Sequence, residues 1–148
     1  MTLAAYRASA AKLRDLRGTT CVGAGTDYAF MLVLDFERIR PHGMHGVQES
    51  PYSLVCECWW RLERREDVIA GSGDEQAAIE ARIAVLRGRR LEDVETFLPS
   101  YTARLAFDGG LALWIFPDDS RQLSSEGGDV DNADWYVISR ALVDGREA

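Results

Sequence analysis

The amino-acid sequence predicts an α+β domain with antiparallel β-sheets and two helices, arranged as two similar halves. Three observations support this prediction: a β-hairpin signal in residues 101–117, two amphipathic stretches that each end in Leu-Arg-Gly, and a strand-like stretch led by tryptophan in each half. A chain of 148 residues is long enough to bury a core of its own. We therefore expect a single domain, residues 1–148, with half-repeats at about 1–72 and 73–148.

The hairpin is predicted by Asp108-Gly109-Gly110, which lies between two apolar runs. A two-residue loop would set Leu105 opposite Ala112 and Arg104 opposite Leu113, which mixes the two faces. A three-residue loop places six apolar residues on one face, because side chains alternate along a strand. The expected pairs are Phe107 with Leu111, Leu105 with Leu113, and Ala103 with Ile115. This loop requires a left-handed residue, which Gly110 supplies.

The second face of the hairpin carries one arginine among apolar residues: Arg104, Ala106, Ala112, Trp114 and Phe116. Such a face is too apolar to be fully exposed to water, so we expect a helix or a partner to cover part of it.

The remaining elements follow from periodicity and turn signals. Helices are expected over residues 2–17 and 75–87, because apolar residues recur every three to four positions and Gly18 or Gly88 follows. The expected helix caps are Thr2 for the first, and Asp74 or a Ser72–Glu75 capping box for the second. Strands are expected over residues 19–22, 28–36, 52–62, 67–70, 89–96 and 135–142. Loops or turns are expected over residues 23–27, 37–51 and 120–133.

The two halves share landmarks at an offset that grows from 70 to 75 residues. The first landmark is the helix ending, Leu16-Arg17-Gly18 and Leu86-Arg87-Gly88. The later ones are a phenylalanine at a strand end and a closing strand led by tryptophan, at Trp60 and Trp135. We interpret the offset as an internal repeat, with chance similarity of common helix endings as the alternative.

The charge balance excludes some partners. The net charge is −7, whereas proteins that bind nucleic acids or anionic membranes need clustered cations. No stretch approaches the ~20 apolar residues of a membrane span, and no apolar run follows Met1 as in a signal peptide. We therefore expect a cytoplasmic protein that binds neither nucleic acid nor membrane.

One group of residues is a candidate metal site. His42 and His45 form an H-x-x-H motif, Cys56 and Cys58 form a C-x-C motif, and zinc binds such side chains tetrahedrally. The spacing matches no common structural zinc pattern, and buried cysteines often act as small hydrophobic residues. We expect no cofactor, with zinc as the alternative. No motif of a nucleophilic enzyme is present in the sequence, so we expect a binding protein rather than an enzyme.

Tryptophan and arginine residues mark a candidate partner-binding set: Trp59, Trp60, Arg61 and Trp114. Adjacent tryptophans on a strand face opposite sides of a sheet, so one should lie in the core and the other should not. Aromatic residues and arginines are enriched at the centres of protein interfaces. The alternative is that the second tryptophan packs under a helix or against the other half.

Residues 60–74 (WRLERREDVIAGSGD), residues 102–119 (TARLAFDGGLALWIFPDD) and Trp135 together resemble a group of small uncharacterised bacterial proteins. That group overlaps in style with immunity proteins that neutralise bacterial toxins. The resemblance implies a stoichiometric protein-binding role and transfers no catalytic residue.

We therefore predict a non-enzymatic protein-binding module, with an immunity-like role as one form of it. Two alternatives stay open. One is a small-ligand or metal-binding protein that uses the region of His42, His45, Cys56 and Cys58. The other is a homodimer whose exposed sheet face is its own interface.

Overall fold

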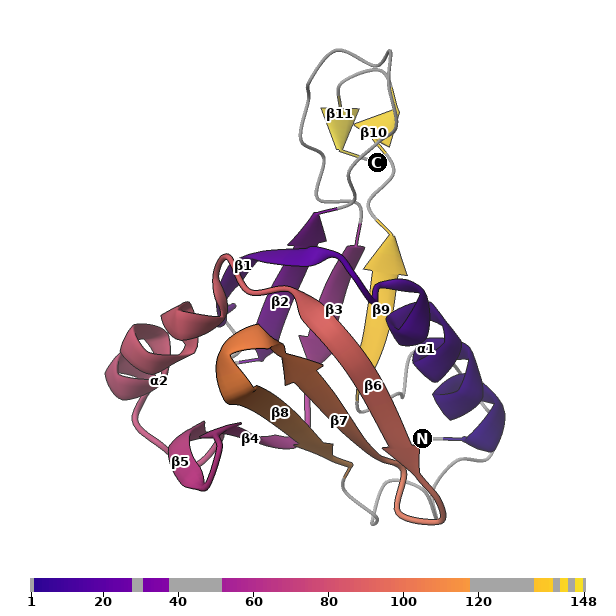
Figure 1. Ribbon diagram of the computed structural model, residues 1–148. Coiled ribbons are helices and arrows are strands. Elements are labelled where there is room, and N and C mark those ends of the chain that lie inside the picture. Colours follow the sequence, from indigo (N-terminus) through magenta and orange to yellow (C-terminus); the bar gives the residue numbers. More distant parts are fainter. Residues whose placement is uncertain are drawn as a thin grey trace.

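The computed structural model describes residues 2–27, 31–37, 52–117, 135–139, 142–143 and 146–147. These residues form two antiparallel sheets that face each other, with a helix at each side (Figure 1). The predicted α+β class, with antiparallel sheets and two helices, is therefore confirmed.

The chain crosses between the two sheets twice, after β3 and after β8. The four-stranded sheet has the order β1-β2-β3-β9 and consists of β1 Thr20–Thr26, β2 Leu32–Glu37, β3 Tyr52–Cys56 and β9 Trp135–Ser139. The five-stranded sheet has the order β5-β4-β8-β7-β6 and consists of β4 Trp59–Arg64, β5 Asp67–Gly71, β6 Leu91–Phe97, β7 Thr102–Phe107 and β8 Leu111–Phe116. A separate pair is formed by β10 Leu142–Val143 and β11 Arg146–Glu147. Strand β4 follows β3 in the chain but pairs with β8, and β9 follows β8 but pairs with β3.

Each helix bridges one edge of each sheet. Helix α1, Leu3–Asp15, packs against β6 and β9. Helix α2, Gln76–Ile83, continues into a 3-10 turn, Ala84–Leu86, and packs against β1 and β5. The predicted cap of α1 is confirmed, because the Thr2 side chain accepts a hydrogen bond from the Ala5 N–H at 3.1 Å. The predicted cap of α2 is wrong: Glu75 occupies that position without a side-chain hydrogen bond.

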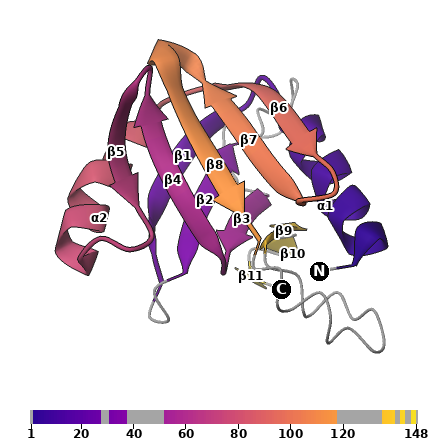
Figure 2. The same cartoon turned by 90° about the horizontal axis from the view of Figure 1, so that it is seen from below.

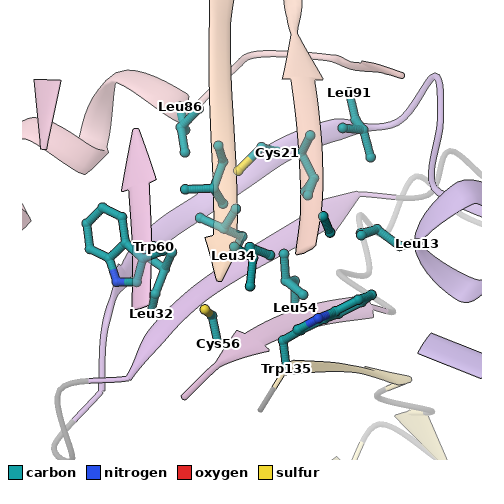
Figure 3. Close-up of a cluster of buried hydrophobic side chains, with 14 of the residues drawn as sticks. Leu13, Cys21, Leu32, Leu34, Leu54, Cys56, Trp60, Leu86, Leu91 and Trp135 are labelled. Carbon is teal, nitrogen blue, oxygen red and sulfur yellow. The ribbon is translucent and has the colours of Figure 1, made fainter. Parts of the chain in front are cut away.

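The core fills the space between the sheets (Figure 3). The removal of these apolar side chains from water is the main driving force for folding. The four-stranded sheet contributes Cys21, Ala24, Leu32, Leu34, Phe36, Leu54, Cys56, Trp135 and Val137. The five-stranded sheet contributes Trp60, Leu62, Ala70, Leu91, Val94, Ala103, Leu105, Phe107, Leu111, Leu113 and Ile115. Phe36 stacks on Phe107 across the two layers, with ring centroids 6.4 Å apart.

The predicted hairpin register is confirmed. Strands β7 and β8 pair Ala103 with Ile115, Leu105 with Leu113 and Phe107 with Leu111, and all six residues are buried. The loop Asp108–Gly110 contains two left-handed glycines, Gly109 with φ 76° and Gly110 with φ 75°.

The single strand predicted over residues 52–62 is wrong. It is two strands, β3 and β4, which belong to different sheets. The chain leaves β3 after Cys56 and enters β4 at Trp59, so Glu57 and Cys58 form the crossing. Both strands carry apolar residues, so the composition does not change where the pairing does. Strand β3 pairs with β2 and β9, whereas β4 pairs with β5 and β8.

The turn predicted over residues 23–27 is also wrong, because β1 continues to Thr26. The pairing of β1 with β2 shifts register between Cys21 and Gly23, and a glycine inside a strand is typical of such a bulge. A Cβ on Gly23 would lie only 2.8 Å from Asp35 Oδ2, so glycine makes room for that carboxylate.

Other predicted boundaries differ by a few residues. Strand β2 spans Leu32–Glu37, β6 spans Leu91–Phe97, and β9 spans Trp135–Ser139. Residues 28–30 and 140–141 of the predicted strands lie outside the described residues. The predicted short strand over residues 67–70 is confirmed as β5. The loop predicted over residues 37–51 begins one residue too early, because Glu37 belongs to β2. The rest of that loop and the loop predicted over residues 120–133 lie outside the described residues.

Residues that are 70 positions apart in the sequence pair with each other where the two halves are in contact. Thr20 forms a β-bridge with Arg90, and the flanking backbone hydrogen bonds form two matched pairs. One pair is Gly18 N to Leu91 O and Gly88 N to Cys21 O, both 2.7 Å; the other is Cys21 N to Arg89 O at 2.8 Å and Leu91 N to Thr19 O at 2.9 Å. The register shifts also correspond, at Val22 and Glu92. A duplication of the whole half stays a prediction.

Candidate functional site

The outer face of the five-stranded sheet carries the candidate site. Figure 2 shows this sheet in front, with α1 and α2 at its two sides rather than on its outer face. Side chains that point into the core alternate with those on the outer face. On the outer face, Arg61 of β4 pairs with Trp114 of β8, Trp114 pairs with Arg104 of β7, and Arg104 pairs with Glu95 of β6. These four residues therefore form one row across the sheet.

The arginines of this row lie over aromatic rings. The Arg104 guanidinium lies 5.6 Å from the centroid of the Trp114 ring, and that of Arg61 lies 5.5 Å from the Phe116 ring. Trp114 stacks with Phe116 and also with Phe97. Cation–π contacts of this kind contribute about 0.5–1 kcal/mol each at exposed sites. The arginines therefore cover part of this apolar face. The sequence analysis expected a helix or a partner to cover it.

Carboxylates hold both arginines in place. Arg104 Nη1 donates to Glu95 Oε1 at 3.1 Å, and Arg61 Nε lies 3.4 Å from Glu63 Oε2. Exposed ion pairs contribute little stability, but two neighbours restrict where each guanidinium can lie. Each guanidinium of this face therefore has both a ring and a carboxylate as neighbours.

The two adjacent tryptophans separate as predicted. Trp60 is buried between the sheets, with 4% of its surface exposed, whereas Trp59 pairs with Phe116 and is 63% exposed. Trp60 therefore takes no part in the outer face, although it belonged to the predicted partner-binding set. We call the remaining surface the aromatic–arginine face and define it as Trp59, Arg61, Phe97, Arg104, Trp114 and Phe116.

Three residues of this face were outside the predicted partner-binding set. The sequence placed Arg104 and Phe116 on the second hairpin face without assigning them a binding role. Phe97 was not identified, although it pairs with Thr102 and is 38% exposed. Extending the predicted hairpin register to the preceding strand would have found it.

The predicted metal set is only partly described. The Cys56 and Cys58 sulfur atoms lie 3.6 Å apart. His42 and His45 lie outside the described residues. Within the part of the chain that the structure describes, no group of three or more histidine, cysteine or acidic side chains is placed to hold a metal ion. A zinc site therefore stays a prediction.

The third cysteine is unsuited to nucleophilic chemistry. Cys21 is fully buried in β1, and its thiol donates to the Gly23 carbonyl at 3.3 Å. Burial, together with the nearby carboxylate of Asp35, raises the pKa of Cys21 to about 12. The thiolate is the reactive form of cysteine, so this side chain is inert at neutral pH.

Among the described helices, neither is long and apolar enough to cross a membrane. No family model matches the chain, and no curated protein or solved structure matches it. The residues of the chain itself are therefore the basis for a functional assignment.

Proposed function

We propose that this protein is a non-enzymatic protein-binding module and that the aromatic–arginine face is its recognition surface. The observation that carries the proposal is the ordered row in which arginines lie over aromatic rings, next to a tryptophan that is 63% exposed. Tryptophan and arginine are the residues most enriched among binding hot spots. Rings and guanidinium groups that are already stacked lose little conformational freedom when a partner binds.

The charge of the chain favours a basic protein partner. Both arginines of the face already pair with carboxylates, so they offer little uncompensated positive charge to an anionic ligand. The chain as a whole carries −7. A basic partner would be steered toward it at low ionic strength. An immunity-like role, in which the partner is a basic toxin, is one form of this proposal.

The test is a pull-down from the native host with the full chain as bait. Wild-type bait should recover a stoichiometric partner, and Trp59→Ala bait should lose most of it. Val22→Ala is the matched control, because Val22 is an exposed hydrophobic residue at 39% on β1, away from this face. Equal recovery with all three baits would refute the role of the face, and recovery of no stoichiometric partner would count against a binding module.

Self-association is the competing use of the same face. Native mass spectrometry of the wild-type chain distinguishes the two, because a homodimer would appear without any added protein. A dimer that Trp59→Ala dissociates and Val22→Ala does not would assign the face to a second copy of this chain. A monomeric wild-type chain would leave the face to a different protein.

A further inference from the structure

A pair of sulfur atoms lies where the chain crosses from one sheet to the other. Strand β3 ends at Cys56, β4 begins at Trp59, and Cys58 lies between them. The two Sγ atoms are 3.6 Å apart, and the Cys56 thiol also lies 3.6 Å from the Cys58 carbonyl oxygen. All three cysteines of the chain are thiols in this structure.

We propose that Cys56 and Cys58 are a covalent modification site, a dithiol that closes reversibly to an intramolecular disulfide. The sulfurs need to approach from 3.6 Å to about 2.05 Å. Both flank a single residue at a bend of the chain, so the approach requires a local adjustment of the crossing rather than a separation of the sheets.

The difference in burial between the two residues sets the order of the reaction. Cys58 is half-buried and Cys56 is buried, with 1% of its surface exposed. A small disulfide such as oxidised glutathione therefore reacts first at Cys58. The Cys58 thiolate attacks one sulfur, the external S–S bond breaks, and one glutathione thiolate leaves to be protonated.

The second step closes the bond inside the protein. Cys56 loses its proton, and its sulfur attacks Cys58 Sγ in the mixed disulfide and displaces the second glutathione. The protein gives up two electrons and two protons in all, and oxidised glutathione becomes two molecules of the thiol. A disulfide closed through one intervening residue is strained, and strained disulfides are readily reduced, so a dithiol reductant should reverse the modification.

Cys21 is a built-in control for the view that these cysteines only fill the core. It is as buried as Cys56, but the described contact of its sulfur is with the Gly23 carbonyl. Burial raises the pKa of Cys21 to about 12, so its thiol stays protonated at neutral pH. Selective oxidation of Cys56 and Cys58, with Cys21 unchanged, would therefore depend on the short distance between the two sulfurs and on the exposure of Cys58. It would not follow from the presence of cysteines alone.

The experiment uses the full chain without a partner. The native protein is equilibrated in glutathione buffers of increasing oxidised fraction, quenched with acid, unfolded, and alkylated with a maleimide. Intact mass should show a change from three labels to one, with loss of two hydrogen atoms, and peptide mapping should place the remaining label on Cys21. Dithiothreitol should restore three labels.

Two variants sharpen the result. Cys21→Ala should still form the disulfide, and Cys58→Ser should lose it. The second substitution changes a half-buried side chain, so the fold should tolerate it. Three labels in wild type across all buffers, a disulfide that includes Cys21, or only intermolecular disulfides would overturn the proposal. None of these outcomes depends on the aromatic–arginine face binding a partner.

Discussion

Substitution of the two adjacent tryptophans should have opposite consequences. Trp60→Ala truncates a buried side chain, because only 4% of the Trp60 surface is exposed. A buried aromatic side chain hides about 150–250 Å², which at ~25 cal/mol per Å² corresponds to roughly 4–6 kcal/mol. Large-to-small substitutions of core aromatics cost about 3–5 kcal/mol, so we expect a loss of about 4 kcal/mol. Trp59→Ala should change the free energy of unfolding by less than about 0.5 kcal/mol, as surface substitutions usually do.

Urea unfolding followed by far-ultraviolet circular dichroism measures both variants without relying on tryptophan fluorescence. With a slope of about 2 kcal/mol per molar urea, Trp60→Ala should lower the midpoint by about 2 M. Trp60→Phe, which keeps a ring in the core, should fall between wild type and alanine. Equal midpoints for Trp59→Ala and Trp60→Ala, or a lower midpoint for Trp59→Ala, would refute the assignment of faces on β4.

Three further outcomes are expected. Gly110→Ala should destabilise the fold by about 1–2 kcal/mol in urea unfolding, because Gly110 has φ 75°. Gly73→Ala is its control and should be neutral, since a Cβ there meets its nearest neighbour at an ordinary 3.9 Å. Hydrogen bonds from the Thr26 hydroxyl and N–H lower the pKa of Glu80 below its usual 4.5. Glu80 therefore stabilises the fold above that pH and loses this effect as the pH falls through its folded value. The stability difference between wild type and Glu80→Gln should shrink from pH 7 to pH 3, and a constant difference would contradict this. Finally, a maleimide at pH 8 should label Cys21 only after unfolding in guanidinium; labelling in the native state would show that burial does not protect it.

The hairpin was predictable because its signals are local. Asp108-Gly109-Gly110 allows left-handed backbone, and alternation of side chains allows one loop length to gather all six apolar residues on one face. Helix α1 was predictable for the same reason, since Thr2 and Gly18 mark its ends. The matched hydrogen bonds around Thr20 and Arg90 explain why both halves place Leu-Arg-Gly before a strand: each glycine is left-handed and donates its N–H to the other half.

The predictions that failed depended on partners distant in the chain. Gly23 and Gly25 were interpreted as a turn, but they lie in β1, where Gly23 leaves room for Asp35 of the next strand. Residues 52–62 were interpreted as one strand, because no change in composition accompanies the change of sheet at Glu57. Local propensity describes a strand equally well in either sheet.

The sequence by itself therefore determined the fold class, the hairpin register and the fact that one of two adjacent tryptophans would be buried. Only the tertiary structure decided that Trp59 is the exposed one, that Arg61 and Arg104 lie over the rings of Phe116 and Trp114, and that two sulfurs meet at the crossing between sheets. The physical reason is that alternation along a strand has two phases. The choice between them depends on which sheet the strand joins and on which face of that sheet the core is packed.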